Sequence, residues 1–143
     1  MDANAGSWQT NGITQNQYDH FGNEINVVNN SFQNGFLEYQ TIYNTTYEYG
    51  AANNVVKEVT EYHNQVSLDK SIITRTFNEN GDLVFLLFEN WYEELQAFRP
   101  TFKEEYEYDN GQQISNLRYI WVETENSYNI KRQSLYEYDE NGC

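Results

Sequence analysis

The sequence has one cysteine, one proline and eight basic residues in 143 residues, and each shortage narrows what the chain can be. Cys143 is the only cysteine, so no disulfide can form within the chain and no cysteine-based zinc cluster is available. No stretch approaches the roughly 18 uncharged apolar residues of a membrane-spanning helix, and no apolar run follows Met1. We therefore expect no signal peptide in this sequence and no membrane insertion.

Basic residues are few and unevenly placed. The chain has 8 Lys and Arg against 22 Asp and Glu, a formal net charge of −14, and no basic residue precedes Lys57. Such a surface repels phosphate backbones and anionic lipid headgroups. We therefore expect no nucleic-acid partner and no binding to membrane surfaces, whereas a basic protein or divalent cations stay open as partners.

Aromatic residues, by contrast, are abundant. Tyr, Phe and Trp make up 17% of the chain, and 13 of these residues are Tyr. Tyr, Phe, Val, Ile and Thr favour strands, and so many aromatic residues with a single Pro are not typical of a disordered tail. The length suits one domain, so we predict a single all-β array over residues 1–143.

One short pattern recurs along the chain: aromatic residues at alternate positions, followed by Asx and Gly residues. It is clearest at 136–142 (YEYDENG) and 106–111 (YEYDNG), and weaker copies end their aromatic part at Tyr18, Tyr49 and Phe77. Alternate residues of a strand share a face, while Asp, Asn and Gly are typical of tight turns. The last aromatic residues before successive turns are 28 to 31 residues apart, so each copy reads as half of a β-hairpin.

This spacing predicts antiparallel β-hairpin repeats of about 30 residues that stack into a curved or spiral sheet. A cap hairpin, four repeats and a partial unit would cover residues 1–15, 16–43, 44–74, 75–103, 104–132 and 133–143. The strand at 133–138 would have no return strand. We therefore expect an exposed sheet edge there, which pairs with a further repeat or with a second copy of the chain.

Two segments allow more than one interpretation. Residues 83–89 are predicted as a strand because the repeat register requires it. The apolar residues between Val84 and Phe98 also fit one face of a helix, so a helical turn within 91–98 stays open. Residues 114–124 have apolar side chains on both alternating faces, which predicts a strand that is covered on both sides or lies in a strongly curved sheet.

The turns at 138–142, 108–111 and 18–23 resemble the YD repeats of Rhs-type and related bacterial surface proteins, especially the Tyr/Asn/Gly-rich arrays of Bacteroidetes secreted proteins. The resemblance implies antiparallel hairpins, an extracellular or cell-surface location, and a role in adhesion, carbohydrate contact or enclosing a toxin. The sequence departs from the pattern at Gly50, which replaces Asp, and at Phe77-Asn78, which replaces Tyr-Asp. Catalytic chemistry in that family lies outside the repeats, so the resemblance implies no catalytic residue.

The aromatic ladder of the recurring pattern is the candidate binding site. Its members are Tyr47, Tyr49, Tyr106, Tyr108, Tyr136 and Tyr138. Aromatic faces can stack on the apolar faces of sugar rings and Tyr hydroxyls can bond sugar hydroxyls, which makes a glycan a candidate ligand. The alternative is that these rings fill the core or pair across strands and bind nothing.

Other polar residues do not form a catalytic or cofactor-binding pattern. His20 and His63 lie in predicted turns without partners at metal-ligand spacing. Neighbouring carboxylates such as Glu93 and Glu94 would point to opposite faces of a strand, so they cannot flank a glycosidic bond. The turn at 78–82 offers oxygen ligands to Ca²⁺ but lacks the spacing of an EF-hand. We predict no enzymatic activity, no cofactor and no metal site.

The function predicted from these features is that of a non-enzymatic structural or adhesive repeat module of a bacterial surface or secreted protein, self-associating through strand edges. Two alternatives stay open. One is a carbohydrate-binding module that uses Tyr and Trp faces. The other is an acidic inhibitor or immunity protein that binds a basic toxin through its charge of −14.

Overall fold

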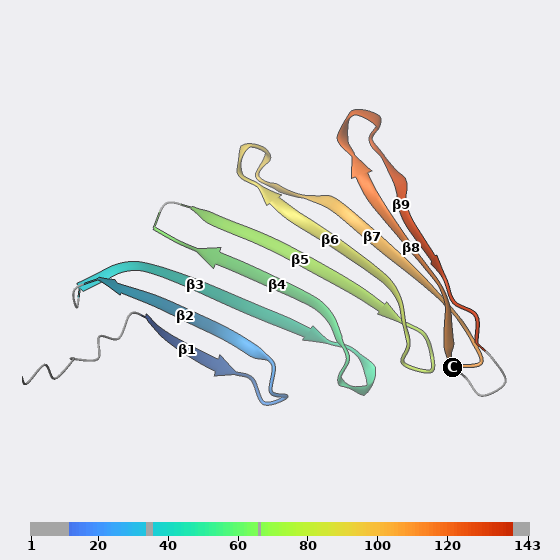
Figure 1. Ribbon diagram of the computed structural model, residues 1–143, viewed down its shortest axis with the longest axis horizontal. Coiled ribbons are helices and arrows are strands. Elements are labelled where there is room, and N and C mark those ends of the chain that lie inside the picture. The colour runs from blue at the N-terminus through green and yellow to red at the C-terminus, as the bar shows by residue number, and fades with distance from the viewer. Residues whose placement is uncertain (1–11, 34–35, 66, 139–143) are drawn as a thin grey trace, which may run out of the picture. The chain divides into compact units, whose positions relative to one another are not determined.

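The computed structural model describes residues 12–33, 36–65 and 67–138. The strands form one antiparallel sheet whose strand order follows the chain from β1 to β9 (Figure 1). They are β1 (Gly12–Tyr18), β2 (Glu24–Gln33), β3 (Phe36–Tyr49), β4 (Val55–His63), β5 (Leu68–Phe77), β6 (Leu83–Tyr92), β7 (Ala97–Asp109), β8 (Gln112–Val122) and β9 (Ser127–Leu135). Three single 3-10 turns accompany them: η1 (Ala51–Asn53), η2 (Glu93–Leu95) and η3 (Glu123–Glu125). The predicted all-β, antiparallel class is confirmed.

Several predicted features lie partly outside the described residues. The cap hairpin at 1–15 and the partial unit at 133–143 are described only for residues 12–15 and 133–138. The strand predicted at 133–138 is displaced toward the C-terminus, because β9 begins at Ser127 and ends at Leu135. The strand predicted at 83–89 is confirmed, because β6 pairs with β5 and β7. The helical turn that stayed open within 91–98 is present as the single 3-10 turn η2, while residues 83–92 and 97–98 belong to strands.

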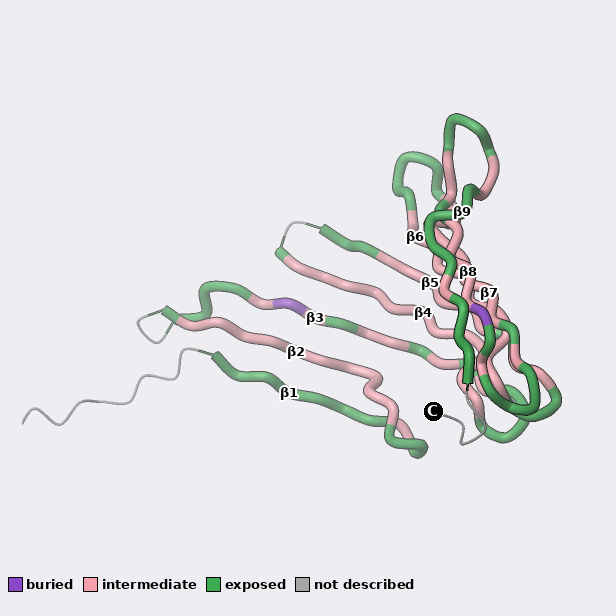
Figure 2. The backbone as a smooth tube through the Cα atoms, turned by 45° about the vertical axis from the view of Figure 1, so that its right-hand side comes forward, coloured by how far each residue is buried: buried purple, intermediate pink, exposed green. Residues whose placement is uncertain are grey.

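No hydrophobic side chain of the described residues is buried, so this part of the sheet has no hydrophobic core. Of the two alternatives for residues 114–124, cover on both sides is wrong, because Ile120 on β8 is 37% exposed, and a strongly curved sheet stays a prediction. Strand residues are mostly half-buried, and the turns are exposed (Figure 2). Cross-strand side-chain contacts, such as that between the rings of Phe88 and Phe102, shield part of these strands.

The chain divides into two compact units. The first contains Met1–Thr45 and Thr60–Asp69, and the second contains Thr46–Val59 and Lys70–Cys143. Strands β3 and β4 contribute to both units. Residues 36–45 of β3 and 60–63 of β4 belong to the first unit, and residues 46–49 of β3 and 55–59 of β4 belong to the second.

Amide side chains connect the strands of the first unit. Asn26 Nδ2 donates to Asn44 Oδ1 at 2.8 Å, which joins β2 to β3. Gln40 Nε2 donates to Asn30 Oδ1 at 2.7 Å across the same pair of strands. Both bonds run between directly facing positions, so they form an uncharged ladder across this pair of strands.

Aromatic and ionic side chains connect the strands of the second unit. The rings of Phe88 on β6 and Phe102 on β7 stack with centroids 5.1 Å apart. The Arg118 guanidinium of β8 lies 4.0 Å from the centroid of the Phe102 ring and 3.3 Å from the carboxylate of Glu104. Each of these side chains therefore covers part of its neighbour, as in other sheets stabilised by side-chain ladders.

The turns after β1 and β5 share one geometry. In each, a side-chain oxygen of the first residue, Asp19 or Asn78, accepts the backbone N–H groups two and four residues later. Gly22 and Gly81 both have φ of +88°, a conformation that glycine adopts without steric cost. These local Asx and Gly signals explain why the sequence predicted the turns correctly.

Candidate functional site

The predicted aromatic ladder is divided among different local settings. Tyr47 and Tyr49 on β3 have ring centroids 6.2 Å apart, as expected for rings on one face. Tyr106 on β7 donates its hydroxyl to the Glu104 carboxylate. Tyr108 donates its hydroxyl to the main-chain oxygen of Leu83 at 3.0 Å. Burial raises the pKa of Tyr106 and of Tyr108, and the bond to Glu104 raises that of Tyr106 further. The hydroxyl of Tyr108 therefore connects β7 to β6, whereas that of Tyr106 bonds within β7.

The other two predicted tyrosines follow the end of β9. The backbone N–H of Tyr136 donates to the main-chain oxygen of Ile114 at 3.0 Å. The hydroxyl of Tyr138 donates to the main-chain oxygen of Gln113 at 2.8 Å, the same type of contact that Tyr108 makes. The six tyrosines are thus distributed over β3, β7 and the segment after β9, and their role as a ligand site stays a prediction.

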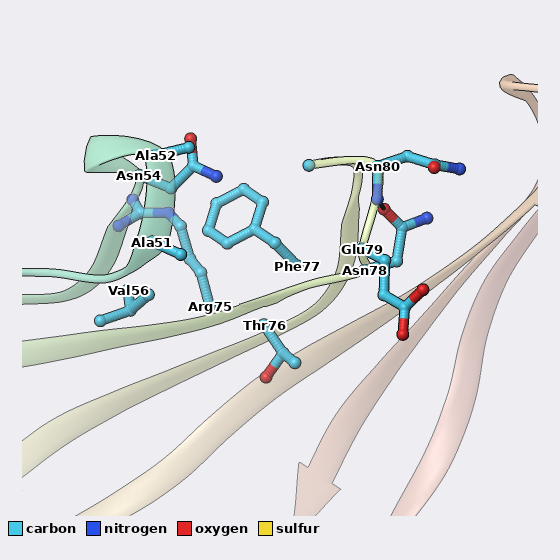
Figure 3. Close-up of a pocket in the computed structure, with 11 residues that line it drawn as sticks. Ala51, Ala52, Asn54, Val56, Arg75, Thr76, Phe77, Asn78, Glu79 and Asn80 are labelled. Carbon is cyan, nitrogen blue, oxygen red and sulfur yellow. Dashed lines mark hydrogen bonds between the residues drawn. The ribbon is translucent and has the colours of Figure 1, made fainter.

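A groove of about 380 Å³ lies in the second unit between the turn after β3 and the turn after β5 (Figure 3). Ala51, Ala52 and Asn54 of the first turn line one side. Arg75 and Phe77, at the end of β5, line the groove between the two turns. Sequence patterns could not predict this groove, because it depends on how closely two neighbouring hairpin turns approach each other.

The first of these turns has an unusual backbone. Ala52 and Asn53 both lie in the left-handed region, with φ of 55° and 61°. A non-glycine residue there typically costs on the order of 1 kcal/mol. Gly50 has no such conformation, but a Cβ atom at this position would lie 2.7 Å from Cγ1 of Val56. Only glycine therefore allows the turn to approach Val56 so closely.

Arg75 is the charged group of the groove. Its Nη2 donates to Oε2 of Glu58 on β4 at 2.9 Å, and both side chains are largely buried. Its Nη1 is buried and has no hydrogen-bond partner among the described residues. In Figure 3 the terminal nitrogens of the Arg75 guanidinium point away from the ring of Phe77, whereas the amide of Asn54 is turned toward that ring. The groove is therefore lined by an aromatic ring and an amide, while the unpaired donor of Arg75 is enclosed.

A second groove, of about 290 Å³, lies in the same unit beside the turns η2 and η3. Tyr92 and Leu95 line one side, and Trp121 and Glu123 line the other. Arg99 also lines this groove and forms an ion pair with Glu123. All charges of this groove are therefore paired within the protein, which leaves mainly apolar surface for contact.

Trp91 and Trp121, which precede η2 and η3, have matching environments. Each indole N–H donates to a glutamate two residues later at 2.8 Å. Each ring meets a second ring edge-on, Phe98 at 5.1 Å or Tyr128 at 5.0 Å between centroids. The bond from Trp91 lowers the pKa of Glu93. The shared spacing of Trp and Glu was the sequence signal that could have identified these two turns.

No metal-binding cluster of three or more His, Cys, Asp or Glu side chains occurs in the described part of the chain. The ring of His20 lies 3.8 Å from that of Phe21, and Nε2 of His63 lies 3.6 Å from a carboxylate oxygen of Glu61. The side chain of Asn78 is used within its own turn. None of the described helical turns is long or apolar enough to span a membrane.

No protein-family model and no curated protein matches the sequence. Solved structures do share the fold. A DUF3836 family protein from Bacteroides vulgatus is 13% identical, with a TM-score of 0.55 over 66% of this chain and 98% of that one. A protein with unknown function from Bacteroides fragilis is 17% identical, with a TM-score of 0.58 over 87% of this chain and 91% of that one.

A further DUF3836 family protein, from Parabacteroides distasonis, is 16% identical and has a TM-score of 0.52 over 69% of this chain and 91% of that one. At such identities the likeness shows the fold alone. The fold therefore occurs in proteins of Bacteroides and Parabacteroides species, and the function of this chain has to be inferred from its own residues.

Proposed function

We propose that this chain is a non-enzymatic structural or adhesive module of a bacterial surface or secreted protein, and that it associates through its strand edges with copies of itself or with neighbouring repeats. The observation that supports the proposal is the outer edge of β9, which pairs with no described strand. Ile130 and Leu135 on this strand are 65% and 70% exposed. An edge of this kind is a template for a further strand.

The composition of the two edge strands supports the same proposal. Natural edges are usually protected by charged residues, Pro or bulges that prevent pairing with other chains. β1 (GITQNQY) has neither a charged residue nor Pro, and all seven of its residues are exposed. Since the described sheet has no buried hydrophobic side chain, a strand added at an edge would also cover side chains of the strand beside it.

The proposal includes a hairpin repeat of about 30 residues. The matching environments of Trp91 and Trp121, 30 residues apart, support this interpretation. So do the matching hydroxyl contacts of Tyr108 and Tyr138, which are also 30 residues apart. Repeats of this kind contact only their neighbours, so an array can be lengthened by adding units at its ends.

The extracellular or cell-surface location is the part of the proposal that rests on sequence resemblance. The turns at 108–111 and 18–23 resemble the YD repeats of bacterial surface proteins. Many secreted domains depend on disulfides for stability, but a sheet that is stabilised by side-chain ladders can do without them.

The test is the mass of the purified chain by light scattering over a concentration series, with reductant present so that Cys143 cannot crosslink it. We expect mass to increase with concentration. Ile130→Lys, which removes an exposed apolar side chain from β9 and adds a charge, should raise the apparent dissociation constant about tenfold. Thr46→Lys adds the same charge on an exposed position of the internal strand β3 and should change it little.

Two outcomes would contradict the proposal. A monomer at every concentration would show that the edges do not pair. An equal effect of Thr46→Lys and Ile130→Lys would show that association depends on net charge or on the sheet faces and not on the edge strand.

A further inference from the structure

We infer that the outer edge of β9 accepts an extended acidic segment of another polypeptide, which adds a strand to the sheet and places a carboxylate opposite Arg132. The inference rests on the proposed function in one respect, because both need the edge of β9 to be open to a further strand (Figure 1). It goes further in naming the chemistry of the partner.

The first observation is a pair of adjacent cations on this edge strand. β9 contains Lys131 and Arg132 but no acidic residue, and both basic residues are exposed. Neither side chain forms an ion pair with a described residue. Most other basic residues of the chain do pair with a glutamate: Lys57, Arg75, Arg99, Lys103 and Arg118. An acidic protein therefore presents two cations without a carboxylate partner among the described residues, side by side on its edge strand.

The second observation is the row of facing residues that ends at Arg132. Directly facing residues of neighbouring strands have side chains on the same face, so the row can be followed across the second unit. It runs from Arg75 on β5 through Leu86, Glu104 and Arg118 to Arg132. Arg75 has the carboxylate of Glu58 on its β4 side. Each arginine inside the row therefore has a glutamate on a neighbouring strand, since Glu104 lies beside Arg118.

Arg132 has no such glutamate beside it. It directly faces Arg118, and like charges in facing positions are unfavourable. Glu104 lies 3.3 Å from the Arg118 guanidinium, so one carboxylate serves a row end with two guanidinium groups. A strand added beyond β9 with Asp or Glu opposite Arg132 would supply the second carboxylate.

The same charges disfavour other occupants of this edge. Charged residues on an edge strand prevent pairing with most chains, and repulsion of wrong partners is a common source of specificity. Antiparallel pairing of two β9 strands about Lys131 would bring the cations of both copies together. The other edge strand, β1 (GITQNQY), has no charge and so offers no carboxylate to Arg132. An acidic strand is therefore the partner that the edge of β9 favours.

The net charge of the chain does not prevent this contact. A formal charge of −14 repels an acidic segment at long range, but charges more than about 8 Å apart are largely screened at physiological ionic strength. The nearby cations then dominate. In this mode of recognition main-chain hydrogen bonds supply affinity, and side chains such as Arg132 supply selectivity.

The experiment measures binding of a labelled peptide to the full chain by fluorescence anisotropy, at protein concentrations below those at which the mass increases. The probe is a seven-residue peptide in which Glu alternates with Val and Thr. We expect saturable binding, and a matched peptide with Gln in place of Glu should bind about fivefold more weakly, the size expected of one exposed ion pair. High salt should reduce this difference. Methylation of alternate backbone nitrogens of the Glu peptide should weaken binding at least about tenfold, because those nitrogens can no longer donate to β9.

Variants show whether the peptide binds at this edge. Arg132→Glu should weaken binding of the Glu peptide about tenfold and make a matched Lys peptide the better ligand. The matched control is Lys57→Glu, which changes the net charge equally but lies on the internal strand β4. It should change the affinity less than about twofold. Circular dichroism checks that both variants are folded.

Four outcomes would overturn the inference. Equal binding of the Glu and Gln peptides, or equal effects of Arg132→Glu and Lys57→Glu, would show that Arg132 selects nothing. Unchanged binding of the methylated peptide would show that no strand is added. Tighter binding of a heparin oligosaccharide than of the Glu peptide would show a general polyanion site.

The peptide titration and the light-scattering experiment fail in different ways. A chain that stays monomeric at every concentration but prefers the Glu peptide contradicts self-association and supports the acidic partner. A chain whose mass increases with concentration but which does not prefer the Glu peptide contradicts the acidic partner alone.

Discussion

In the first unit neighbouring strands are joined mainly by amide and hydroxyl side chains, whereas in the second they are joined mainly by aromatic rings and ion pairs. The pair Asn26 and Asn44 represents the first kind, and the stack of Phe88 and Phe102 the second. All eight basic residues of the chain belong to the second unit, the earliest being Lys57. The comparison teaches that a sheet without a buried core can be stabilised by either set of cross-strand contacts, with different sensitivity to salt and pH.

The largest effect should come from the aromatic stack of the second unit. Phe102→Ala removes a ring that touches both Phe88 and the Arg118 guanidinium, and we expect it to lower the free energy of unfolding by about 2–3 kcal/mol. Denaturant unfolding measures the loss. The matched control is Phe36→Ala in the first unit, where the side chain is 78% exposed and the loss should stay below about 0.5 kcal/mol. Equal losses of unfolding free energy in the two variants would mean that the ring stack contributes no stability of its own.

A smaller effect distinguishes the amide contacts of the first unit from the ion pairs of the second by their response to salt. Glu104→Gln removes the charge that pairs with Arg118, and Asn44→Ala removes the amide that accepts from Asn26. Each should cost about 1 kcal/mol at low ionic strength. At high salt the cost of Glu104→Gln should shrink because screening weakens an ion pair, while the cost of Asn44→Ala should not change. The comparison fails if both costs respond to salt in the same way.

The smallest effect is the loss of stability at low pH. Hydrogen bonds from Trp91 and Gln96 lower the pKa of Glu93, and the hydrogen bond from Lys103 lowers that of Glu105. A carboxyl group whose pKa is lowered by folding stabilises the protein above its unfolded pKa, near 4.5, and this contribution is lost as the pH falls through the folded value. The amide ladder of the first unit does not titrate. Amide hydrogen exchange should therefore show loss of protection in the second unit first as the pH falls below about 4.5.

The Glu105→Gln variant is the control for the acid experiment, because it removes one of the titrating groups and should reduce the pH dependence of the second unit. Simultaneous loss of protection in both units at the same pH would contradict the comparison.

The turns and strands were largely predictable from the sequence because their signals are local. The Asx and Gly residues at 78–82 and 50–54 marked turns that the structure contains, and the aromatic alternation marked β7 correctly. The apolar residues of 83–92 were assigned to a strand only through their spacing from other turns, since their pattern also fitted a helix. Local signals therefore sufficed wherever a turn fixed the position of the strands beside it.

The exposure of the strands and the two grooves could not be predicted. Apolar residues on both faces of 114–124 showed which side chains could be buried but not whether a second layer exists to bury them. The partner of Arg75 is Glu58, on a different strand, and no periodicity connects them. The contacts of the candidate tyrosines could not be predicted for the same reason: Tyr108 and Tyr138 bond to backbone atoms 25 residues earlier, which depends on how neighbouring hairpins align.

The chain-order arrangement of the strands also governs how quickly the protein reaches its native state. β-sheet proteins usually fold slowly, because strands that are far apart in the sequence have to meet before any contact compensates the lost chain entropy. Here each strand pairs only with the strand before it and the strand after it. Each hairpin can therefore form as soon as its second strand leaves the ribosome, and the sheet can grow during synthesis without waiting for the rest of the chain.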